Sequence, residues 1–278
     1  MKLNPFYVDD IIKTALLEDI NYIDTSADLV IEPEQISEAY FQAKADGVLC
    51  GLDIALRVFM LLDPAFSAVC EKRDGDEVHR GEVIARLKGH TVSLLKGERT
   101  ALNLLQHMSG IATATRRAVC LVEGTKASVA DTRKTLPGLR PLQKYAVTVG
   151  GGKNHRYNLS DAAMLKDNHI DAAGSITAAI TKLRQRAGHM VKIEVETRNL
   201  QEVQEALDVG ADVIMLDNMD VEQMRRAVEL NNGRALLEAS GNITDQTIAA
   251  VAQTGVDIIS IGALTHSVQA FDISMKIK

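Results

Sequence analysis

The spacing of apolar residues predicts a short helix near the start of the chain and then a region rich in strands. Apolar side chains recur at helical spacing over residues 8–16. From residue 36 to about 97, alternating apolar and polar positions broken by glycines predict strands at 37–45, 65–73 and 83–88. Between them, residues 52–62 carry a helical pattern that stops before Asp63-Pro64. The first third therefore predicts a mixed α/β layer.

A long helix is expected at about 97–123, and beyond it the pattern becomes a repeat of strand and helix. Apolar runs end at Asp131, Glu196, Asp217, Ser240 and Gly262, and the last four ends are separated by 21, 23 and 22 residues. Nearly continuous apolar runs such as 213–216 indicate parallel strands covered on both faces. The regular interval favours a β/α barrel, and no GxGxxG follows any of these runs, which argues against a dinucleotide-binding fold.

The ends of these predicted strands carry polar residues or glycine. Reactive groups of β/α barrels gather at the carboxyl ends of the strands. A strand-terminal aspartate such as Asp217 can instead cap the following helix. Because the same position is polar on successive strands, the pattern favours a site over isolated caps.

Two strand-to-helix turns contain small residues, at 238–242 and 260–263. Such turns let backbone N–H groups approach an anion, and the positive end of the helix dipole adds to the attraction. Both are interpreted as phosphate contacts, with tight turning as the alternative. The run Gly-Gly-Gly-Lys at 150–153 is no P-loop, because that motif requires glycine at Val147 and Ser or Thr at Asn154.

Composition narrows the class of protein. The chain of 278 residues has a formal net charge of −6 and only 4% aromatic residues, which argues against nucleic-acid binding. No apolar run reaches the length of a membrane span, and the first ten residues do not resemble a secretory signal. Cys50, Cys70 and Cys120 fit neither a disulfide framework nor a zinc site, so free thiols in a reducing cytoplasm are expected.

The charge is unevenly distributed along the chain. Residues 131–170 hold seven Lys or Arg and three Asp, a local charge of +4, which leaves −10 for the remainder. The basic residues alternate with glycine, threonine, histidine and asparagine, unlike an ordinary solvated lysine face. Arginine offers a bidentate fork for carboxylate or phosphate, and lysine a compact charge. The island therefore predicts a small ligand with several negative charges.

A set of motifs in this order resembles the quinolinate phosphoribosyltransferase family, also called nicotinate-nucleotide pyrophosphorylase (carboxylating). The resemblance covers nearly the whole chain and departs only near the start, where the family often has Gly-Asp-Xaa-Thr and this chain has Ile-Asp-Thr-Ser at 23–26. The motifs are GERTALN at 97–103, SGIAT at 109–113, DTRKTLPG at 131–138, GGGKNHR at 150–156, LKDNH at 165–169, EVE at 194–196, LDN at 216–218, EASGN at 238–242 and GALTHS at 262–267.

The resemblance implies a type II phosphoribosyltransferase fold. An N-terminal α/β sandwich is expected over 1–110, with 268–278 returning to it, and an incomplete β/α-barrel catalytic domain over 111–267. The implied reaction joins quinolinate to phosphoribosyl pyrophosphate (PRPP) with Mg²⁺ and gives nicotinate mononucleotide, pyrophosphate and CO₂ for NAD biosynthesis. A cytoplasmic homodimer with shared active sites, or a hexamer of such dimers, is implied as well.

The resemblance also assigns roles to residues of this chain. Quinolinate would be held by Thr132, Arg133, His155, Arg156 and Lys166, with Arg99 entering from the partner subunit. Lys134 would face the pyrophosphate or ribose, and Glu196 and Asp217 would act on the ribose or hold Mg²⁺, directly or indirectly. The phosphate and PRPP contacts would be Lys134, Asn218, Ser240, Gly241, Asn242, Ile261, Gly262 and Ala263.

Other functions are compatible with parts of the pattern. A paralogue of the same fold, molybdenum-transport-associated or nicotinate-using, is the nearest, but paired Arg133 and Arg156 with Lys166 favour a dicarboxylate. A barrel aldolase would need a Schiff-base lysine at a strand end, whereas Lys192 begins its run. A non-catalytic carrier or metabolite-sensing module could use the segment 75–85, which resembles a biotinyl hairpin but lacks an attachment lysine at its tip.

Overall fold

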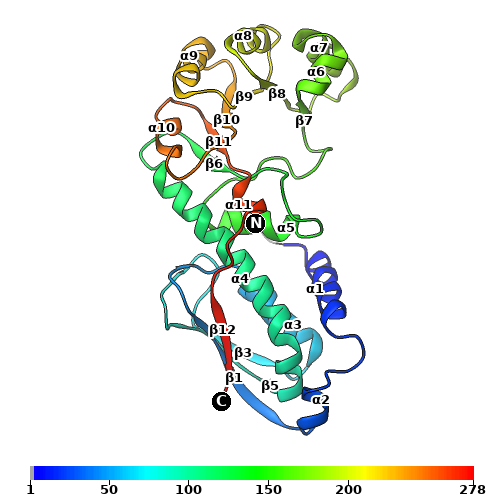
Figure 1. Cartoon of the computed structure of the whole chain (residues 1–278). Coiled ribbons are helices and arrows are strands. Elements are labelled where there is room, and N and C mark those ends of the chain that lie inside the picture. Colours follow the sequence, from blue (N-terminus) through cyan, green and yellow to red (C-terminus); the bar gives the residue numbers. More distant parts are fainter. Residues whose placement is uncertain (1–2) are drawn as a thin grey trace. The chain divides into compact units, whose positions relative to one another are not determined.

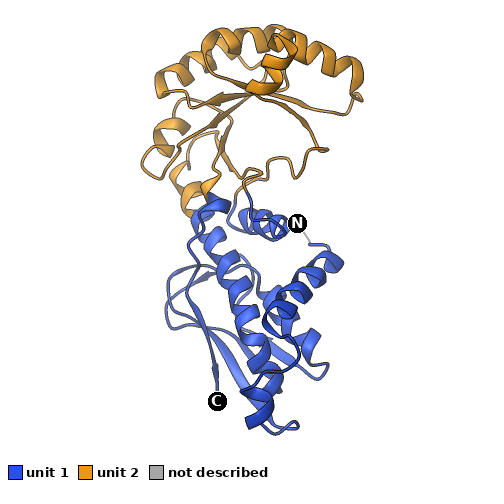
Figure 2. Ribbon diagram, turned by 45° about the vertical axis from the view of Figure 1, so that its right-hand side comes forward, with its two compact units in different colours: residues 1–116, 135–151, 264–278 blue, residues 117–134, 152–263 orange. Residues whose placement is uncertain are grey.

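The computed structural model describes residues 3–278, which form two compact units (Figure 2). Unit 1 takes the chain up to Arg116 together with 135–151 and 264–278, and unit 2 takes 117–134 and 152–263. From the sequence, all of 111–267 is expected in one barrel domain. Residues 111–116, 135–151 and 264–267 lie inside that range and cluster with unit 1 instead.

Unit 1 is built on a four-stranded antiparallel sheet in the order β12-β1-β5-β3, with strands β1 (Ile36–Ala43), β3 (Ser67–Cys70), β5 (Val83–His90) and β12 (Ile273–Ile277). The strand β12 at the chain's end pairs with β1, where Phe41 faces Met275 in the register. Burial alternates along β1, so one face of the sheet enters the core. Strands β2 (Gly47–Val48) and β4 (Glu77–Val78) form a separate antiparallel pair.

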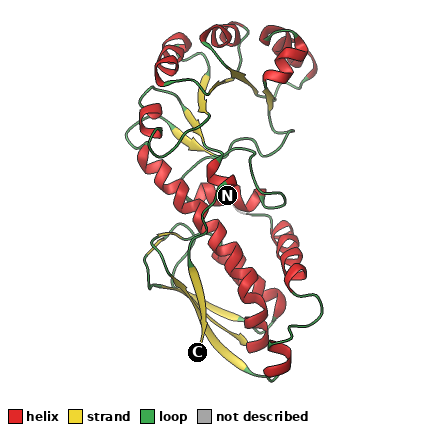
Figure 3. Cartoon of the chain, viewed as in Figure 1, coloured by secondary structure: helices red, strands yellow, loops and turns green. Residues whose placement is uncertain are grey.

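Apolar residues of the helices at 5–19, 52–62, 91–121 and 140–149 form one buried core with strands of this sheet. Figure 3 shows the long helix lying along one face of the sheet. Phe59 of α3 lies 6.1 Å from Phe41 of β1 between ring centroids, and burying each such ring contributes about 3 kcal/mol. The helix predicted at 52–62 is confirmed without change. The helices are α1 (Pro5–Asp19), α2 (Ala27–Val30), α3 (Leu52–Leu62), α4 (Thr91–Leu121), whose last residues belong to unit 2, α5 (Arg140–Val149) and α11 (Ala263–His266).

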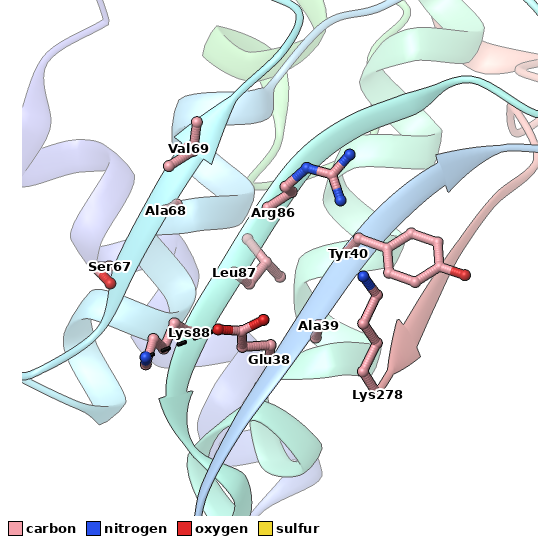
Figure 4. A pocket seen from close by; sticks show the side chains of 10 residues that line it. All are labelled: Glu38, Ala39, Tyr40, Ser67, Ala68, Val69, Arg86, Leu87, Lys88 and Lys278. Atoms are coloured by element: carbon pink, nitrogen blue, oxygen red, sulfur yellow. Dashed lines mark ion pairs between the residues drawn. The ribbon is translucent and has the colours of Figure 1, made fainter.

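The other face of the unit 1 sheet is open and polar. A hollow of about 250 Å³ lies on it, and Figure 4 shows its side chains standing on β1, β3, β5 and the chain's end. Lys88 Nζ is 3.7 Å from Glu38 Oε1 at the surface, and Lys278 Nζ lies over the Tyr40 ring, 5.8 Å from its centre.

Unit 2 is a six-stranded parallel sheet in the order β6-β11-β10-β9-β8-β7. Within the described residues its edge strands β6 and β7 do not pair with each other, which makes it an incomplete barrel, as predicted. Helices lie along its outer face, as α8 and α9 do in Figure 1. The strands are β6 (Ser128–Ala130), β7 (Ala163–Leu165), β8 (Ile193–Thr197), β9 (Val213–Asp217), β10 (Leu236–Ser240) and β11 (Ile258–Ser260), and the helices are α6 (Asp167–Ala173), α7 (Ile176–Arg186), α8 (Leu200–Asp208), α9 (Val221–Asn231) and α10 (Ile248–Ala252).

The predicted elements differ from the structure mainly within the basic segment. The strands and the long helix are displaced by a few residues at their ends, with α4 starting at Thr91. Strand β7, which has only three residues, and helix α5 were not predicted. Helix α5 does carry an apolar stripe at helical spacing, formed by Leu142, Ala146 and Val149, beside the buried polar residues Gln143 and Lys144. No helix between residues 3 and 278 combines the length and apolar character needed to cross a membrane.

Candidate active site

A cavity of about 580 Å³ lies at the carboxyl ends of the parallel strands of unit 2. Strands of one parallel sheet end at the same edge, so side chains that follow different strands converge there. The cavity is lined by Thr132, Arg133, Lys134, His155, Arg156, Met164, Lys166, Asp167, Glu196, Met215, Asp217, Asn218, Glu238 and Ser240. These residues come from all along unit 2, and nearly all are polar or charged.

Four cations line this cavity, from the turn after β6, the loop before β7 and the end of β7. They are Arg133, Lys134, Arg156 and Lys166. The Arg156 guanidinium donates to the Ala162 carbonyl oxygen at 2.9 Å, which fixes it against the loop. Burial, and after it the positive charge of Arg133, lowers the pKa of Arg156. The cavity is therefore a place where positive charge is crowded, and a bound anion would relieve that crowding.

Two carboxylates stand at the ends of β8 and β9. Glu196 accepts a charge-assisted hydrogen bond from Lys166 Nζ, so the predicted substrate cation and the predicted ribose carboxylate are direct neighbours. Asp217 accepts from Asn218 Nδ2 at 3.0 Å, and Ser240 lies beside Asp217 in the β9–β10 register. Positive and negative groups thus share one wall of the cavity, as a substrate that is anionic and develops positive charge requires.

The loop that carries His155 and Arg156 is held by a buried aspartate. Asp131 follows β6, is fully buried, and accepts from the His155 backbone N–H at 2.8 Å and from Asn154 Nδ2 at 2.7 Å. In the sequence, Asp131 is recognisable only as a strand end. Its role in the structure is to tie the strand β6 to the loop at 153–156, and so to bring Arg133 and Arg156 to the same cavity.

Below the cations lie two further carboxyl groups that sequence reasoning did not assign to the site. His155 Nε2 is 3.0 Å from Glu194 Oε2 and 3.7 Å from Glu238 Oε1. Alternation could have revealed both, because residues two apart on a strand face the same side, and Glu196 and Ser240 face the cavity. Burial, followed by the nearby Glu194 charge, raises the pKa of Glu238 to about 7.

The turn after β10 has a backbone that suits a close contact. Gly241 has φ +100°, and a Cβ there would lie 2.2 Å from Asn218 Oδ1. Asn218 and Asn242 also have positive φ, and Asn242 Nδ2 donates to Asn218 Oδ1 at 3.1 Å. Asn218 thus fills the space left by the missing glycine side chain. This explains why glycine is required, and it leaves phosphate binding here a prediction.

Not every predicted site residue lines the cavity. Ser240 and Asn218 do, whereas Gly241, Asn242, Ile261, Gly262 and Ala263 lie in the turns beyond β10 and β11 without being among its lining residues. Arg99 belongs to α4 within unit 1, and its contribution to a partner's site stays a prediction. Lys192 precedes β8 and pairs with Asp212 at 3.1 Å, so it is no strand-end Schiff-base lysine.

Comparison with known proteins gives one consistent result. The family model "Quinolinate phosphoribosyl transferase, N-terminal domain" matches residues 23–109, and "Quinolinate phosphoribosyl transferase, C-terminal domain" matches residues 111–276.

Similar proteins span the same length. The "Probable nicotinate-nucleotide pyrophosphorylase [carboxylating]" of Bacillus subtilis is 46% identical over 275 residues, which cover 99% of this chain and 95% of that protein. The chloroplastic "Nicotinate-nucleotide pyrophosphorylase [carboxylating]" of Arabidopsis thaliana is 44% identical over 96% of this chain and 82% of its own length. Among solved structures, NadC from Streptococcus pyogenes superposes with a TM-score of 0.97 at 44% identity, covering 100% of this chain and 99% of that one. The chain therefore belongs to the quinolinate phosphoribosyltransferase family.

Proposed function

We propose that this protein transfers the phosphoribosyl group of PRPP to quinolinate, with loss of CO₂, and releases nicotinate mononucleotide and pyrophosphate for NAD biosynthesis. The observation that carries the proposal is the joint lining of one cavity by Arg133, Arg156, Lys166, Glu196 and Asp217. A ligand with adjacent carboxylates matches the cations, and a reacting centre that becomes positive matches the two carboxylates. Family membership and the 46% identical relative support the same reaction.

Quinolinate would lie against the cations of the β6 turn and the loop before β7. Arg133 and Arg156 offer planar donors for its two carboxylates, Lys166 a third charge and Thr132 a hydroxyl or backbone contact. The ring nitrogen must then face the anomeric carbon of the donor. Because Lys166 is bound to Glu196, the contact that holds quinolinate also positions a carboxylate near the ribose.

The bonds that form and break in the first step determine which charges the protein has to stabilise. The nitrogen lone pair of quinolinate forms the bond to the anomeric carbon, while the carbon–oxygen bond breaks and its electron pair leaves with pyrophosphate. Positive charge develops on the sugar between these events. Glu196 and Asp217 are fixed carboxylates that would stabilise it, and Lys134 would face the departing pyrophosphate.

Loss of CO₂ would follow formation of the glycosidic bond. The bond from C2 to its carboxylate breaks, its electron pair stays at C2 beside the cationic ring nitrogen, and C2 takes up a proton. A mononucleotide that retains the 2-carboxylate, trapped in a single turnover, would support this order. Release of CO₂ from quinolinate without PRPP would contradict it.

The carboxylates of the cavity are compatible with Mg²⁺ that binds mainly through PRPP. Magnesium prefers oxygen ligands and keeps several waters, so it needs only one or two protein carboxylates. Asp217 and Glu196 are the residues that would hold it, and since Glu196 already binds Lys166, Asp217 is the freer of the two. Bound there, the metal supplies charge neutralisation for the pyrophosphate.

The test is a direct assay with matched substrates. Purified protein is incubated with PRPP, Mg²⁺ and either quinolinate or nicotinate, and nicotinate mononucleotide and CO₂ are followed. Turnover of quinolinate with stoichiometric CO₂ is expected, with little product from nicotinate. Product from nicotinate alone would indicate the nicotinate-using paralogue, and no product from either would contradict the proposal.

We also propose a cytoplasmic homodimer, or a hexamer of dimers, in which Arg99 enters the partner's site. The motif around Arg99 supports it, and Arg99 is not among the residues that line the cavity. An inactive Arg99→Ala protein mixed with an inactive Arg133→Ala protein should regain activity, up to about a quarter of wild type if subunits exchange at random. If an equal mixture of the two variants regains no activity, the proposal that subunits share active sites is wrong.

A further inference from the structure

The wall of the cavity contains a buried acid that the proposed chemistry does not use. Glu238 is 2% exposed and Glu194 is 6% exposed. Each lies two positions before a strand-end residue, on β10 and β8, and therefore on the same side as Ser240 and Glu196. Glu238 lines the cavity that holds the four cations, so its charge is felt by anything bound there.

The geometry around His155 shows which of the two carboxyl groups accepts a hydrogen bond from its ring. The backbone N–H of Arg156 donates to His155 Nδ1 at 2.8 Å, so Nδ1 is an acceptor and the ring proton is on Nε2. Nε2 is 3.0 Å from Glu194 Oε2, which is a hydrogen bond, and 3.7 Å from Glu238 Oε1, which is too long for one. The Nε2–H group of His155 therefore donates to Glu194 and not to Glu238.

Glu238 is thus a second carboxyl group in a space that already contains one carboxylate. The nearest ligand atoms of His155, Glu194 and Glu238 all lie within 4.8 Å of one another. Two carboxylates this close and this buried do not both ionise readily, and burial with the Glu194 charge raises the pKa of Glu238 to about 7.

The other groups around Glu238 oppose one another. The charge of His155 and, after it, a hydrogen bond with Ser260 of β11 lower its pKa, and the charge of Asp131 after β6 raises it. The charged and titratable residues lining the two cavities that Glu238 borders are Lys126, Lys134, Lys153, His155, Arg133, Arg156, Lys166, Asp167, Glu194, Glu196, Asp217 and Asp257.

We propose that Glu238 works as a neutral carboxylic acid that sets the charge selectivity of this cavity, so that a dianionic substrate binds best while Glu238 keeps its proton. The inference rests on the proposed function for the identity of the dianion. When Glu238 ionises, its negative charge opposes the second carboxylate of the ligand more than it opposes a monoanion. By linkage, binding a dianion near pH 7.5 must draw a proton onto Glu238.

Calorimetry can measure this without any turnover. Quinolinate and nicotinate are titrated into the wild-type protein from pH 6 to pH 8.5, in buffers of different ionisation enthalpy. Carboxylic acids ionise near pH 4, so neither ligand changes its carboxylate charge over this range. Quinolinate affinity should fall roughly tenfold across it and nicotinate affinity less, with proton uptake accompanying quinolinate binding near pH 7.5.

Two variants complete the experiment. Glu238→Gln should bind quinolinate with the low-pH affinity throughout and take up no proton, whereas Glu229→Gln, a control on α9, should behave as wild type. Wild-type binding of quinolinate without proton uptake would overturn the inference, even if Glu238→Gln fails to fold.

If the protein does not act on quinolinate, the wild-type protein should bind quinolinate at no pH, which differs from binding without proton uptake. The protonation of Glu238 is then read by infrared difference spectra between pH 6 and pH 8.5, as a protonated-carboxyl band present in wild type and missing in Glu238→Gln. Absence of that band overturns the inference independently.

Discussion

The hollow on the open sheet of unit 1 and the cavity at the strand ends of unit 2 contain similar residue types and differ in what surrounds them. On the open sheet of unit 1, the side chains of Glu38 and Lys88 are 64% and 60% exposed, and their charges are paired in water. Beside the cavity of unit 2, the side chains of Glu194 on β8 and of His155 are 8% and 11% exposed. Charges at an exposed site interact weakly because water screens them, whereas the same charges at a desolvated site shift pKa values and attract ligands.

The topology of each sheet determines whether its charged side chains are spread out or gathered together. In the antiparallel sheet, alternate residues of β1 and β5 face solvent along the whole strand, so charges are spread over a surface. In the parallel sheet, six strands end at one edge, and their terminal residues meet there. The first arrangement makes a solvated face, and the second concentrates functional groups.

The largest expected effect comes from removing a cation of the unit 2 cavity. Arg133→Ala should reduce kcat/KM for quinolinate by roughly 100- to 1,000-fold, about 3 to 4 kcal/mol, because a desolvated charge partner of the ligand is lost. The KM for PRPP should change far less. The control is Arg86→Ala, whose guanidinium pairs with Glu71 on the exposed sheet and whose loss should leave both constants unchanged. Equal effects on both substrates would refute the role assigned to Arg133.

A carboxylate at a strand end should matter for the rate more than for binding. Asp217→Asn is expected to lower kcat by about 100-fold, since it removes fixed negative charge from the developing cation. Glu38→Gln, on the open sheet, is the matched change and should lower kcat by less than about twofold. Steady-state kinetics at saturating substrates measures both, and an unchanged kcat for Asp217→Asn would exclude the proposed stabilisation.

Two glycines with the same backbone conformation separate a close contact from a simple turn. Gly241→Ala places a Cβ against Asn218 Oδ1, so we expect a loss of about 2 kcal/mol in unfolding free energy and a higher KM for PRPP. Gly81 in unit 1 has φ +96°, and a Cβ added there would have nothing within 4 Å, so Gly81→Ala should cost only the backbone strain, about 1 kcal/mol. Chemical denaturation measures the loss of unfolding free energy in each variant. Equal losses in the two variants would show that Asn218 moves aside and that the close contact at Gly241 is not required.

The smallest effect concerns the pH dependence of stability. Burial opposes ionisation of Asp63 in unit 1, but the backbone N–H groups of Ala65 and His90 and the His90 ring outweigh it and lower its pKa. A lowered carboxyl pKa gives stability that is present above the unfolded pKa, near 4, and is lost as pH falls through the folded value.

The pKa of Glu238 is shifted in the opposite direction to that of Asp63, so its effect on stability depends on pH in the opposite way. Its raised pKa means that its stability contribution is present at low pH and is lost as pH rises from about 4.5 to about 7. Asp63→Asn should therefore destabilise by about 1 kcal/mol at pH 7 and less at pH 3, while Glu238→Gln should gain stability relative to wild type above pH 7. Urea denaturation across pH tests both, and parallel curves for the two variants would contradict the assignment.

Much of the fold follows from local patterns. The helix Leu52–Leu62 is strongly amphipathic and ends before a proline, and strands β8, β9 and β10 carry apolar runs at a regular interval, so their positions could be predicted. Strand β7 could not, because a three-residue strand has no measurable period. Helix α5 has a helical stripe at Leu142, Ala146 and Val149, so its absence from the predicted elements has no physical cause of this kind.

The site was predicted in part. Strand-end residues Glu196 and Asp217 and the cations of the basic segment line one cavity, as the order of strands and the motifs indicated. Strand alternation could have placed the buried acids Glu194 and Glu238 on the cavity side, but not shown their state of ionisation. Nothing local distinguishes a glutamate that is ionised in water from one that is enclosed beside another carboxylate.

By itself, the sequence determined the family, the class of the two sheets and the residue types available for chemistry. These depend on hydrophobic period, turn residues and the order of motifs, all of which are local. Only the tertiary structure decided that His155 donates a hydrogen bond to Glu194, that Lys166 binds Glu196, and that Glu238 lies next to a second carboxyl group. Protonation and ion pairing depend on distance and desolvation between residues far apart in the chain, and those quantities exist only once the strands lie side by side.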